Sequence, residues 1–324
     1  MAEPAADRVR SLVAEAEGSD PGELSLRPIP GGASRETWLL EGEDRRWVLR
    51  RDPPGSQSLV PIEGEYELIR AAGDAAVPVP TPLAFEPPGG RLDTAAMLMA
   101  FVPGTSVAPR ILRKPEYERA RERLPGQVAA ALAAIHSVAT ADLDGVLPPG
   151  ASDPAMAQVE EWEHQLDRIG EPLPAVELGL RWLRANAPEP VRGRLVHGDF
   201  RLGNFIADEE GLGAVIDWEL AHLGDPAEDI GWLCIRSWRF GNDELPVAGL
   251  AGLGAFLDAY ERAGGARPGP ERVRYWEVFG NVKWAVICAR QAHDHLTGVR
   301  RSHELASLGR RICEPEWDML ELIR

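Results

Sequence analysis

Cysteine is scarce in this sequence: the three residues, Cys234, Cys288 and Cys313, lie far apart and form no CxxC pair. We therefore expect neither a disulfide framework nor a zinc cluster, and this usage fits a reducing cytoplasm. Positive charge is also scarce, because 35 Lys and Arg residues stand against 51 Asp and Glu, giving a net charge of −16. A nucleic-acid-binding protein needs a basic face, so this balance argues against that class of partner.

Long apolar runs are missing too. No window approaches the roughly 18 uninterrupted apolar residues of a membrane helix. The opening segment, MAEPAADRVRSLVAEAEG, contains acidic residues and no continuous apolar core, unlike a secretory signal. The chain does have 324 residues, 44% of them hydrophobic, which allows a sizeable core and predicts about two domains or lobes. We expect a soluble, cytoplasmic protein without a membrane partner.

The residue pattern changes near Phe101. Before it, alternating apolar segments and two short helical segments are separated by glycine and proline turns, and Pro103-Gly104 ends this region. Beyond it, segments such as YERARERLPGQVAAALAAIHSV are rich in helix formers, and only RLVH, NFIAD and GAVID return to a strand pattern. We therefore predict an α+β protein, with a small antiparallel sheet within residues 1–101 and a larger, mainly helical part in residues 102–324.

Two segments carry the candidate chemistry. HGDFRLGN, residues 197–204, lies in a predicted loop between strand patterns, and AVIDWE, residues 214–219, places a second acid at the end of the next strand. Phosphoryl transfer needs a carboxylate that accepts the proton of the attacking hydroxyl, and oxygen ligands for magnesium on the phosphates. Asp199 fits the base, while Asn204 and Asp217 fit the ligands. Each residue alone also suits an ordinary turn, so the prediction depends on their combination.

These segments resemble the aminoglycoside phosphotransferase family. The likeness also involves VLRRDPPG (48–55), DWELAHLGDP (217–226) and YWEVFGNVKWAVIC (275–288), and it covers roughly residues 25–300. Within the family, the chain is most similar to the branch of kinase-like domains fused to acyl-CoA dehydrogenases. The resemblance implies a bilobal protein-kinase-like fold. It also implies a kinase that uses Mg²⁺ to move the γ-phosphate of ATP, or of GTP, to a hydroxyl of a small molecule.

In the larger lobe, the resemblance assigns roles to the residues of these two segments. It gives Asp199 the position of the catalytic base, and Asn204 and Asp217 the magnesium positions. His197 matches a loop histidine that braces the loop, and we favour this role over proton transfer because a bracing hydrogen bond needs no titration.

In the smaller lobe, the resemblance points to a cation and its partner acid. Arg50 occupies the position that is lysine in most kinases and would bind the α- and β-phosphates, with Arg51 as the competing candidate. Arginine keeps a permanent forked charge but places it differently from lysine. Glu65 matches the acid that pairs with this cation, and Glu67 is its rival. The alternative for these acids is a solvated helix face.

The expected nucleotide-covering turn contains Gly31, Gly32 and Ser34. PGGAS does not match GxGxxG, so a simple hairpin turn remains the alternative, since glycine serves both uses. MLMAFVPG resembles the hinge of this fold, where backbone groups from Met99 to Phe101 would meet the adenine.

Several other features favour a structural interpretation. His293 and His295 lie two residues apart on a predicted helix, diverge, and have no evident third ligand. We expect Asp225 to cap a helix and Asp229 to lie in its first turn, where an acid suits the helix dipole. Four tryptophans are predicted to belong to the core or to the wall of an acceptor pocket: Trp232, Trp238, Trp276 and Trp284.

The acceptor stays open at this stage. A cationic aminoglycoside suits the acidic composition, whereas the resemblance to the dehydrogenase-fused branch suggests a hydroxyacyl thioester, and a fold does not set its substrate. No DFG-to-APE segment follows Asp217, which disfavours a protein substrate. A nucleotide-binding module without turnover is a second hypothesis. A metal hydrolase that uses His197 and Asp199 is a third, although the remaining ligand pattern is missing.

Overall fold

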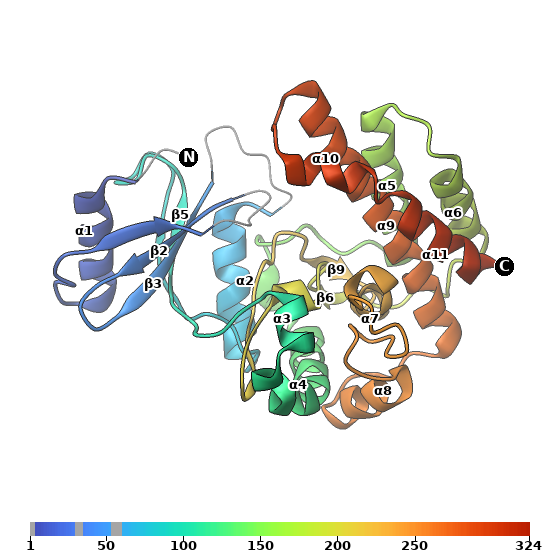
Figure 1. Cartoon of the computed structure of the whole chain (residues 1–324), viewed down its shortest axis with the longest axis horizontal. Coiled ribbons are helices and arrows are strands. Elements are labelled where there is room, and N and C mark those ends of the chain that lie inside the picture. Colours follow the sequence, from blue (N-terminus) through green and yellow to red (C-terminus); the bar gives the residue numbers. More distant parts are fainter. Residues whose placement is uncertain (1–3, 30–34, 53–59) are drawn as a thin grey trace.

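The computed structural model describes residues 4–29, 35–52 and 60–324. Figure 1 shows a smaller lobe built on a sheet beside a larger lobe built mainly of helices. The predicted α+β class and the division into a sheet lobe and a helical lobe are therefore confirmed.

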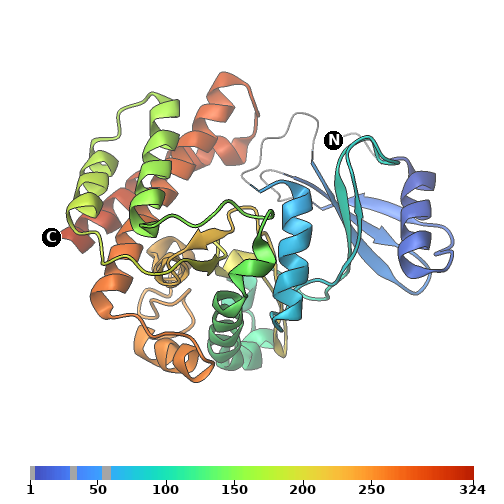
Figure 2. The ribbon, with the colours of Figure 1, turned by 180° about the vertical axis from the view of Figure 1, so that it is seen from behind.

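The smaller lobe contains a five-stranded antiparallel sheet in the order β1-β2-β3-β5-β4. Side chains alternate between its two faces. In β3, Trp47 and Leu49 pack with α1, whereas Val48 faces the core shared with α2. In both Figures 1 and 2, α2 lies between the sheet and the larger lobe. The elements of this lobe are α1 (Ala6–Glu17), β1 (Ser25–Pro28), β2 (Glu36–Glu41), β3 (Arg46–Arg51), α2 (Ile62–Asp74), β4 (Pro82–Glu86) and β5 (Ala96–Ala100).

The segment after β5 joins the lobes. Gly104 has φ 132°, and a Cβ there would lie 2.9 Å from Ile206 Cγ2, so the close approach to β7 requires glycine. Next to it, Thr105 exchanges backbone hydrogen bonds with Ala207, at 2.8 Å and 3.0 Å. The connection is thus fixed against the larger lobe.

The larger lobe is organised around α9, whose middle is buried and which packs against α5, α6, α7, α10 and α11. The expectation that Asp225 caps α7 was wrong by one residue, because Pro226 occupies the cap position; Asp225 still accepts from the N–H of Ala227 at 3.0 Å. The helices are α3 (Ala108–Arg113), η1 (Pro115–Tyr117), α4 (Glu118–Ser137), η2 (Thr140–Leu143), α5 (Pro154–Ile169), α6 (Pro174–Ala185), η3 (Leu202–Asn204), α7 (Ala227–Cys234), η4 (Arg236–Trp238), α8 (Leu253–Arg262), α9 (Pro270–Thr297), α10 (His303–Gly309) and α11 (Cys313–Ile323).

Two small ladders lie in the larger lobe. β6 (Arg194–Val196), β7 (Phe205–Asp208) and β8 (Gly211–Val215) confirm the three strand patterns predicted there. β9 (His222–Gly224) was not predicted, because its residues, HLG, contain one apolar side chain and no β-branched residue. β9 pairs with β6 and β7 pairs with β8, which brings the start of HGDFRLGN close to the segment that follows Asp217.

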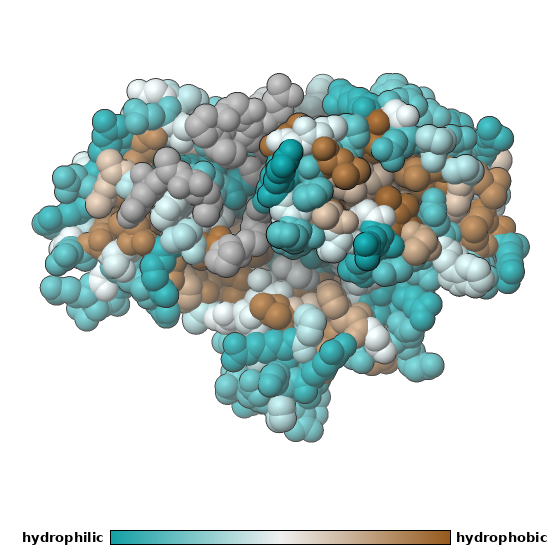
Figure 3. Space-filling view, turned by 45° about the horizontal axis from the view of Figure 1, so that its top comes forward, coloured by the Kyte–Doolittle hydropathy of each residue, from teal (hydrophilic) through white to brown (hydrophobic). Residues whose placement is uncertain are grey.

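Hydrophilic side chains cover most of the face shown in Figure 3, and apolar side chains appear there in separate patches. Within the described residues, no helix combines the length and the apolar character needed to cross a bilayer.

Candidate active site

The segment HGDFRLGN begins where β6 ends, and its first peptide groups are held by a buried acid. Both oxygens of Asp229, in α7, accept backbone hydrogen bonds at 2.9 Å, from His197 and from Gly198. His136 of α4 contacts the same carboxylate at 3.0 Å. Burial alone would raise the pKa of Asp229, but the hydrogen bond and charge of His136, together with His197, outweigh it and lower this pKa. Asp229 does lie in the first turn of α7, as predicted. We had expected it only to interact with the helix dipole, and its hydrogen bonds to the HGDFRLGN backbone were not predicted.

Gly198 occupies a conformation that only glycine accommodates in this loop. Its φ is 77°, and a Cβ at this position would collide with the carbonyl oxygen of Leu220. The backbone of HGDFRLGN therefore passes directly against the segment that follows Asp217.

His197 is completely buried and both of its ring nitrogens are engaged. Nε2 lies 3.2 Å from the carbonyl oxygen of Ile216, and Nδ1 accepts from the N–H of Asp199 at 3.2 Å. A proton on Nε2 alone satisfies both contacts, and burial lowers the pKa of His197. A neutral imidazole with two backbone partners suits a brace between the two loops rather than a proton carrier.

The Asp199 carboxylate receives three side-chain hydrogen bonds. Oδ1 accepts from the indole N–H of Trp232 at 2.9 Å and from Arg201 Nε at 3.0 Å. Oδ2 accepts from Asn204 Nδ2 at 2.6 Å. Trp232 belongs to the core, as predicted, but its contact with Asp199 was missed. Arg201 was missed as well, since an arginine in a loop carries no periodic signal.

Aromatic rings surround this carboxylate on one side. The Arg201 guanidinium lies 4.7 Å from the centre of the Trp238 ring. Trp238 lies 5.2 Å from Trp232 and 4.8 Å from Trp284, measured between ring centres. The predicted tryptophans 232, 238 and 284 thus form one cluster beside Asp199, whereas Trp276 is buried against Phe279 and Tyr275.

Asn204 and Asp217 line the same cavity, which has a volume of about 330 Å³. We had expected Asp217 at the end of a strand. β8 ends at Val215, so Asp217 lies two residues beyond the strand. Its φ of 71° is left-handed, a conformation that aspartate tolerates better than most residues. The N–H of Ile216 donates to the carbonyl oxygen of Asn204 at 2.9 Å, which ties the two loops together.

Arg50 is the arginine that faces this cavity. It is paired with Glu65 and lies 3.2 Å from Asp217 Oδ1. Burial opposes its charge, but the carboxylates of Glu65 and Asp217 outweigh burial and raise the pKa of Arg50. Arg51 points to the opposite face of β3, as strand alternation requires, and it pairs with Glu36 at 2.7 Å.

Glu65 rather than Glu67 is the inward-facing acid of α2. Glu65 is fully buried, whereas Glu67 is exposed and pairs with Arg70 at 3.0 Å. Glu65 also accepts from Arg35, a buried arginine that we did not predict, and from the N–H of Trp218 at 3.3 Å. This single carboxylate therefore connects the sheet with the segment that carries Asp217.

The hinge contributes to the same cavity, but two of its N–H groups are occupied. Ala100 donates to Thr81 at 2.9 Å and Phe101 donates to Arg46 at 3.3 Å. Val102 also lines the cavity, and its N–H makes no hydrogen bond to the backbone of the described residues. The predicted residues Gly31, Gly32 and Ser34 lie outside the described residues.

Apolar side chains form the other walls of the cavity. They come from the sheet, from α2 and from the β7–β8 region: Ile29, Val48, Ile69, Met99, Phe101, Ile206 and Ile216. An apolar slot with a few polar groups at one end is typical of a site for a small organic ligand.

The described residues contain no group of three or more His, Cys, Asp or Glu side chains that would hold a metal by themselves. His295 Nδ1 accepts from the N–H of Ser302 at 3.1 Å, which fits the structural interpretation of this histidine. The two engaged nitrogens of His197 likewise leave the metal-hydrolase hypothesis without support.

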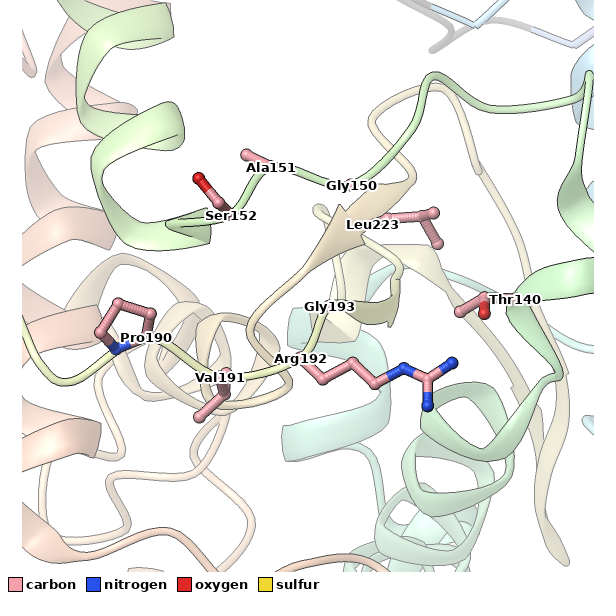
Figure 4. A pocket seen from close by; sticks show the side chains of 9 residues that line it. All are labelled: Thr140, Gly150, Ala151, Ser152, Pro190, Val191, Arg192, Gly193 and Leu223. Atoms are coloured by element: carbon pink, nitrogen blue, oxygen red, sulfur yellow. The ribbon is translucent and has the colours of Figure 1, made fainter.

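A second hollow, of about 450 Å³, lies away from these residues (Figure 4). It is wider than the first but is built from the loops before α5 and before β6, and none of the predicted site residues lines it. Its walls are mainly small or apolar, and the one charged side chain in it, Arg192, is exposed. We therefore place the candidate site in the smaller cavity, because polar groups converge there.

Comparison with known proteins agrees with this arrangement. Residues 25–276 match the phosphotransferase enzyme family, so the chain belongs to that family. Over its whole length it is also similar to an aminoglycoside phosphotransferase homologue from Ralstonia eutropha, with 23% identity, a TM-score of 0.77, and 99% and 98% of the two chains covered. A spectinomycin phosphotransferase in complex with ADP and spectinomycin gives 13% identity, a TM-score of 0.67 and 98% coverage of both chains. The fold is thus the bilobal protein-kinase-like fold that the resemblance implied.

Curated relatives come from the dehydrogenase-fused branch. The chain is 36% identical to acyl-CoA dehydrogenase family member 10 of Mus musculus over 222 residues, 66% of this chain and 20% of that protein. It is 32% identical to the probable acyl-CoA dehydrogenase IBR3 of Arabidopsis thaliana over 238 residues, 67% of this chain and 28% of that protein. The chain thus spans less than a third of the length of these relatives.

Proposed function

We propose that this chain is a small-molecule kinase that transfers the γ-phosphate of ATP, or of GTP, to a hydroxyl group, with Asp199 as the base. The observation that carries this proposal is the convergence of Asn204, Asp217 and Arg50 on one cavity beside the Asp199 carboxylate. Membership of the phosphotransferase family supports it. We assign residues 1–101 to the nucleotide-covering lobe, and residues 102–324 to the lobe that carries the base and the acceptor pocket.

The nucleotide base fits the apolar end of the cavity. The N–H of Val102, which has no backbone partner among the residues that the structure describes, would donate to a ring nitrogen of the adenine, one residue beyond the predicted hinge range. Arg50 would meet the phosphates at the polar end. The raised pKa of this side chain keeps it cationic throughout the physiological pH range.

The residues at the polar end suit Mg²⁺. Asn204 and Asp217 offer an amide and a carboxylate oxygen to the same space, and Mg²⁺ is usually held by one or two protein ligands together with phosphate oxygens and water. When bound, the ion neutralises phosphate charge. Asp217 is now paired with Arg50 at 3.2 Å, so Arg50 would leave this carboxylate for the phosphates.

Asp199 would accept the proton of the acceptor hydroxyl as that oxygen attacks the γ-phosphorus, while the bond from this phosphorus to the β-phosphate oxygen breaks and the nucleoside diphosphate leaves. The Trp232 and Asn204 hydrogen bonds hold the carboxylate in place without protonating it. Arg201 lies 3.0 Å from the carboxylate, and with Asp199 as the base its cation would stabilise the charge that develops on the transferred group.

The acceptor is a small molecule with a hydroxyl group. A cationic antibiotic and a hydroxyacyl thioester are the two classes that we consider. The matched relatives are acyl-CoA dehydrogenase family members, which favours the thioester as the first class to test. Arg201 beside the base also disfavours a polycation at this point.

The test is a screen of hydroxylated metabolites, hydroxyacyl thioesters and aminoglycosides for an ATP-dependent gain of one phosphoryl group in mass. Asp199→Ala should abolish transfer but keep Mg-nucleotide binding, whereas Asp217→Ala should weaken that binding itself. Asp258→Ala, an exposed acid in α8, is the matched control and should behave like the wild type. Retained transfer in Asp199→Ala would contradict the base assignment.

A nucleotide-binding module without turnover is the second candidate. The arginine at position 50 and its ion pair with Asp217 favour it, because they differ from the lysine expected in most kinases. Binding of Mg-ATP without ATP consumption across the whole acceptor panel would support this alternative.

A further inference from the structure

Lys283 is a buried lysine that the mechanism above does not use. It lies in the middle of α9, its side chain is 2% exposed, and its ammonium group contacts the loop that carries Asp199. Removing an ammonium ion from water is unfavourable unless partners replace its hydration, and methionine would fill similar space without this penalty. The charge at this position therefore needs an explanation.

The first contact of Lys283 is with the backbone next to Asp199. Nζ donates to the carbonyl oxygen of Gly198 at 2.6 Å. This oxygen belongs to the peptide group that joins Gly198 to Asp199, and the N–H of the same group donates to His197 Nδ1 at 3.2 Å. Both polar atoms of the peptide are thus held by side chains. Because this peptide sets the direction in which the Asp199 side chain leaves the backbone, Lys283 helps to fix that direction.

The second contact leads to the carboxylate through an aromatic ring. Nζ lies 4.9 Å from the centre of the Trp232 ring, whose N–H donates to Asp199 Oδ1 at 2.9 Å. A cation is attracted to the negative face of an aromatic ring. It also draws electron density away from the N–H at the ring edge, which strengthens the hydrogen bond that Trp232 donates.

Glu228 and His222 complete the buried group. Glu228 Oε1 lies 3.3 Å from Lys283 Nζ, and Oε2 lies 3.0 Å from His222 Nε2. His222 Nδ1 lies 2.9 Å from the carbonyl oxygen of Leu220 and therefore carries a proton. Burial opposes a charge on His222, but Glu228 outweighs it and raises the pKa of His222. The Glu228 carboxylate is thus shared by Lys283, in α9, and His222, on the segment after Asp217.

We propose that Lys283 is a positioning residue for phosphoryl transfer, which holds the Gly198–Asp199 peptide and the Trp232 indole so that the Asp199 carboxylate faces the acceptor hydroxyl. This inference rests on the proposed function, because it takes Asp199 to be the base. Lys283 does not line the 330 Å³ cavity, so it acts through Asp199 and not on the nucleotide.

The first test measures MgATP turnover, as phosphate release to water, in Lys283→Met and Lys283→Arg. Lys283→Met should lower turnover about 10-fold to 100-fold, the effect of misplacing a catalytic group slightly. The KM for ATP and the Kd for MgADP should stay close to the wild-type values. Lys283→Arg, which keeps the charge, should recover most of the rate. Val286→Ala, a buried α9 substitution in the packing core of the lobe, controls for lost stability and should keep the wild-type rate.

A double-mutant comparison separates positioning from general structural damage. The comparison uses the residual phosphate release that remains in Asp199→Ala: on that background Lys283→Met should lower the residual rate no further, since its effect passes through the missing carboxylate. If Lys283→Met lowers turnover by the same factor with and without the Asp199 carboxylate, the proposed role of Lys283 is overturned, whereas the proposed function is not affected. Full turnover in Asp199→Ala alone, or no ATP consumption by the wild type with water or with any member of the acceptor panel, would overturn the proposed function and this role with it.

An activity-free measurement keeps the inference testable if a variant is poorly active. In ¹⁵N-labelled protein, the indole N–H resonance of Trp232 is assigned by its loss in Trp232→Phe. Lys283→Met should shift this resonance in the same direction as Asp199→Ala, and Lys283→Arg should leave it near its wild-type position. An unchanged resonance together with unchanged turnover in Lys283→Met would overturn the inference.

Discussion

Asp229→Asn replaces one oxygen with nitrogen at a fully buried position, and we expect it to destabilise the protein strongly. In the wild type, Oδ1 accepts from the Gly198 N–H, while Oδ2 accepts from the His197 N–H and contacts His136, at distances of 2.9, 2.9 and 3.0 Å. Asparagine keeps only one oxygen. Whichever way its amide is turned, one backbone N–H of the loop faces an NH₂ group instead of an acceptor.

The magnitude follows from these contacts. A hydrogen bond to a charged group contributes about 1.5–3 kcal/mol. Asp229→Asn loses one such bond at a buried position, so it should lower the free energy of unfolding by about 3 kcal/mol. Asp229→Ala removes both acceptors, leaves His136 Nε2 without its carboxylate partner, and should lower this free energy by about 3–5 kcal/mol.

The difference in the free energy of unfolding between the wild type and Asp229→Asn should also depend on pH. Although burial opposes its charge, Asp229 has a lowered pKa in the folded protein, because of His136 and His197. The ionised carboxylate therefore stabilises the fold above the unfolded pKa of about 3.9, and this stabilisation is lost as the pH falls through the lower folded value. The gap between wild type and Asp229→Asn should be complete at neutral pH and should close in acid.

Urea unfolding, followed by tryptophan fluorescence, measures this gap at neutral pH and across the acid range. Asp74→Asn, an exposed acid at the end of α2, is the control and should change the free energy of unfolding by less than about 0.5 kcal/mol. A variant Asp229→Asn within about 1 kcal/mol of the wild type at neutral pH would refute the reasoning, since a bond to a buried charge contributes more than that.

Three further predictions concern other buried or charged contacts. Glu65→Gln should lower the free energy of unfolding by about 3 kcal/mol and weaken MgADP binding in calorimetry, because two buried arginines lose their shared carboxylate. Arg201→Gln should lower transfer at least about 10-fold with an unchanged Kd for MgADP; equal losses in both would contradict its assignment to the transferred group. Burial raises the pKa of Glu277 to about 7, so the folded state binds a proton that the unfolded chain has released above its pKa of about 4.3. Wild-type stability should therefore fall, relative to Glu277→Gln, as the pH rises between these two values, and a constant difference in urea unfolding would contradict this.

Short-range patterns were sufficient for much of the fold. The alternation in RWVLRR fixes which side chains of β3 share a face, and it already separates Arg50 from Arg51, because neighbouring residues of a strand point to opposite sides. The spacing of apolar residues likewise located α1 and α2, and the richness in helix formers located α4.

Sequence patterns predicted only part of the candidate site. The motif residues Asp199, Asn204 and Asp217 stand out in the sequence because they lie in two short segments that β7 and β8 bring together. The hinge range stays a prediction, because strand pairing decides which N–H groups are already bonded, and pairing depends on partners such as Thr81 and Arg46.

By itself, the sequence determined the class of fold with its sheet lobe and helical lobe, and it suggested the three oxygen-bearing side chains of the proposed site, since these follow from local patterns and from residues close together in the chain. Only the tertiary structure decided what holds them. Asp229 reaches His197 across 32 positions and Lys283 reaches Gly198 across 85. Contacts of that separation depend on how α7 and α9 pack, and packing of distant elements leaves no periodic trace in the sequence.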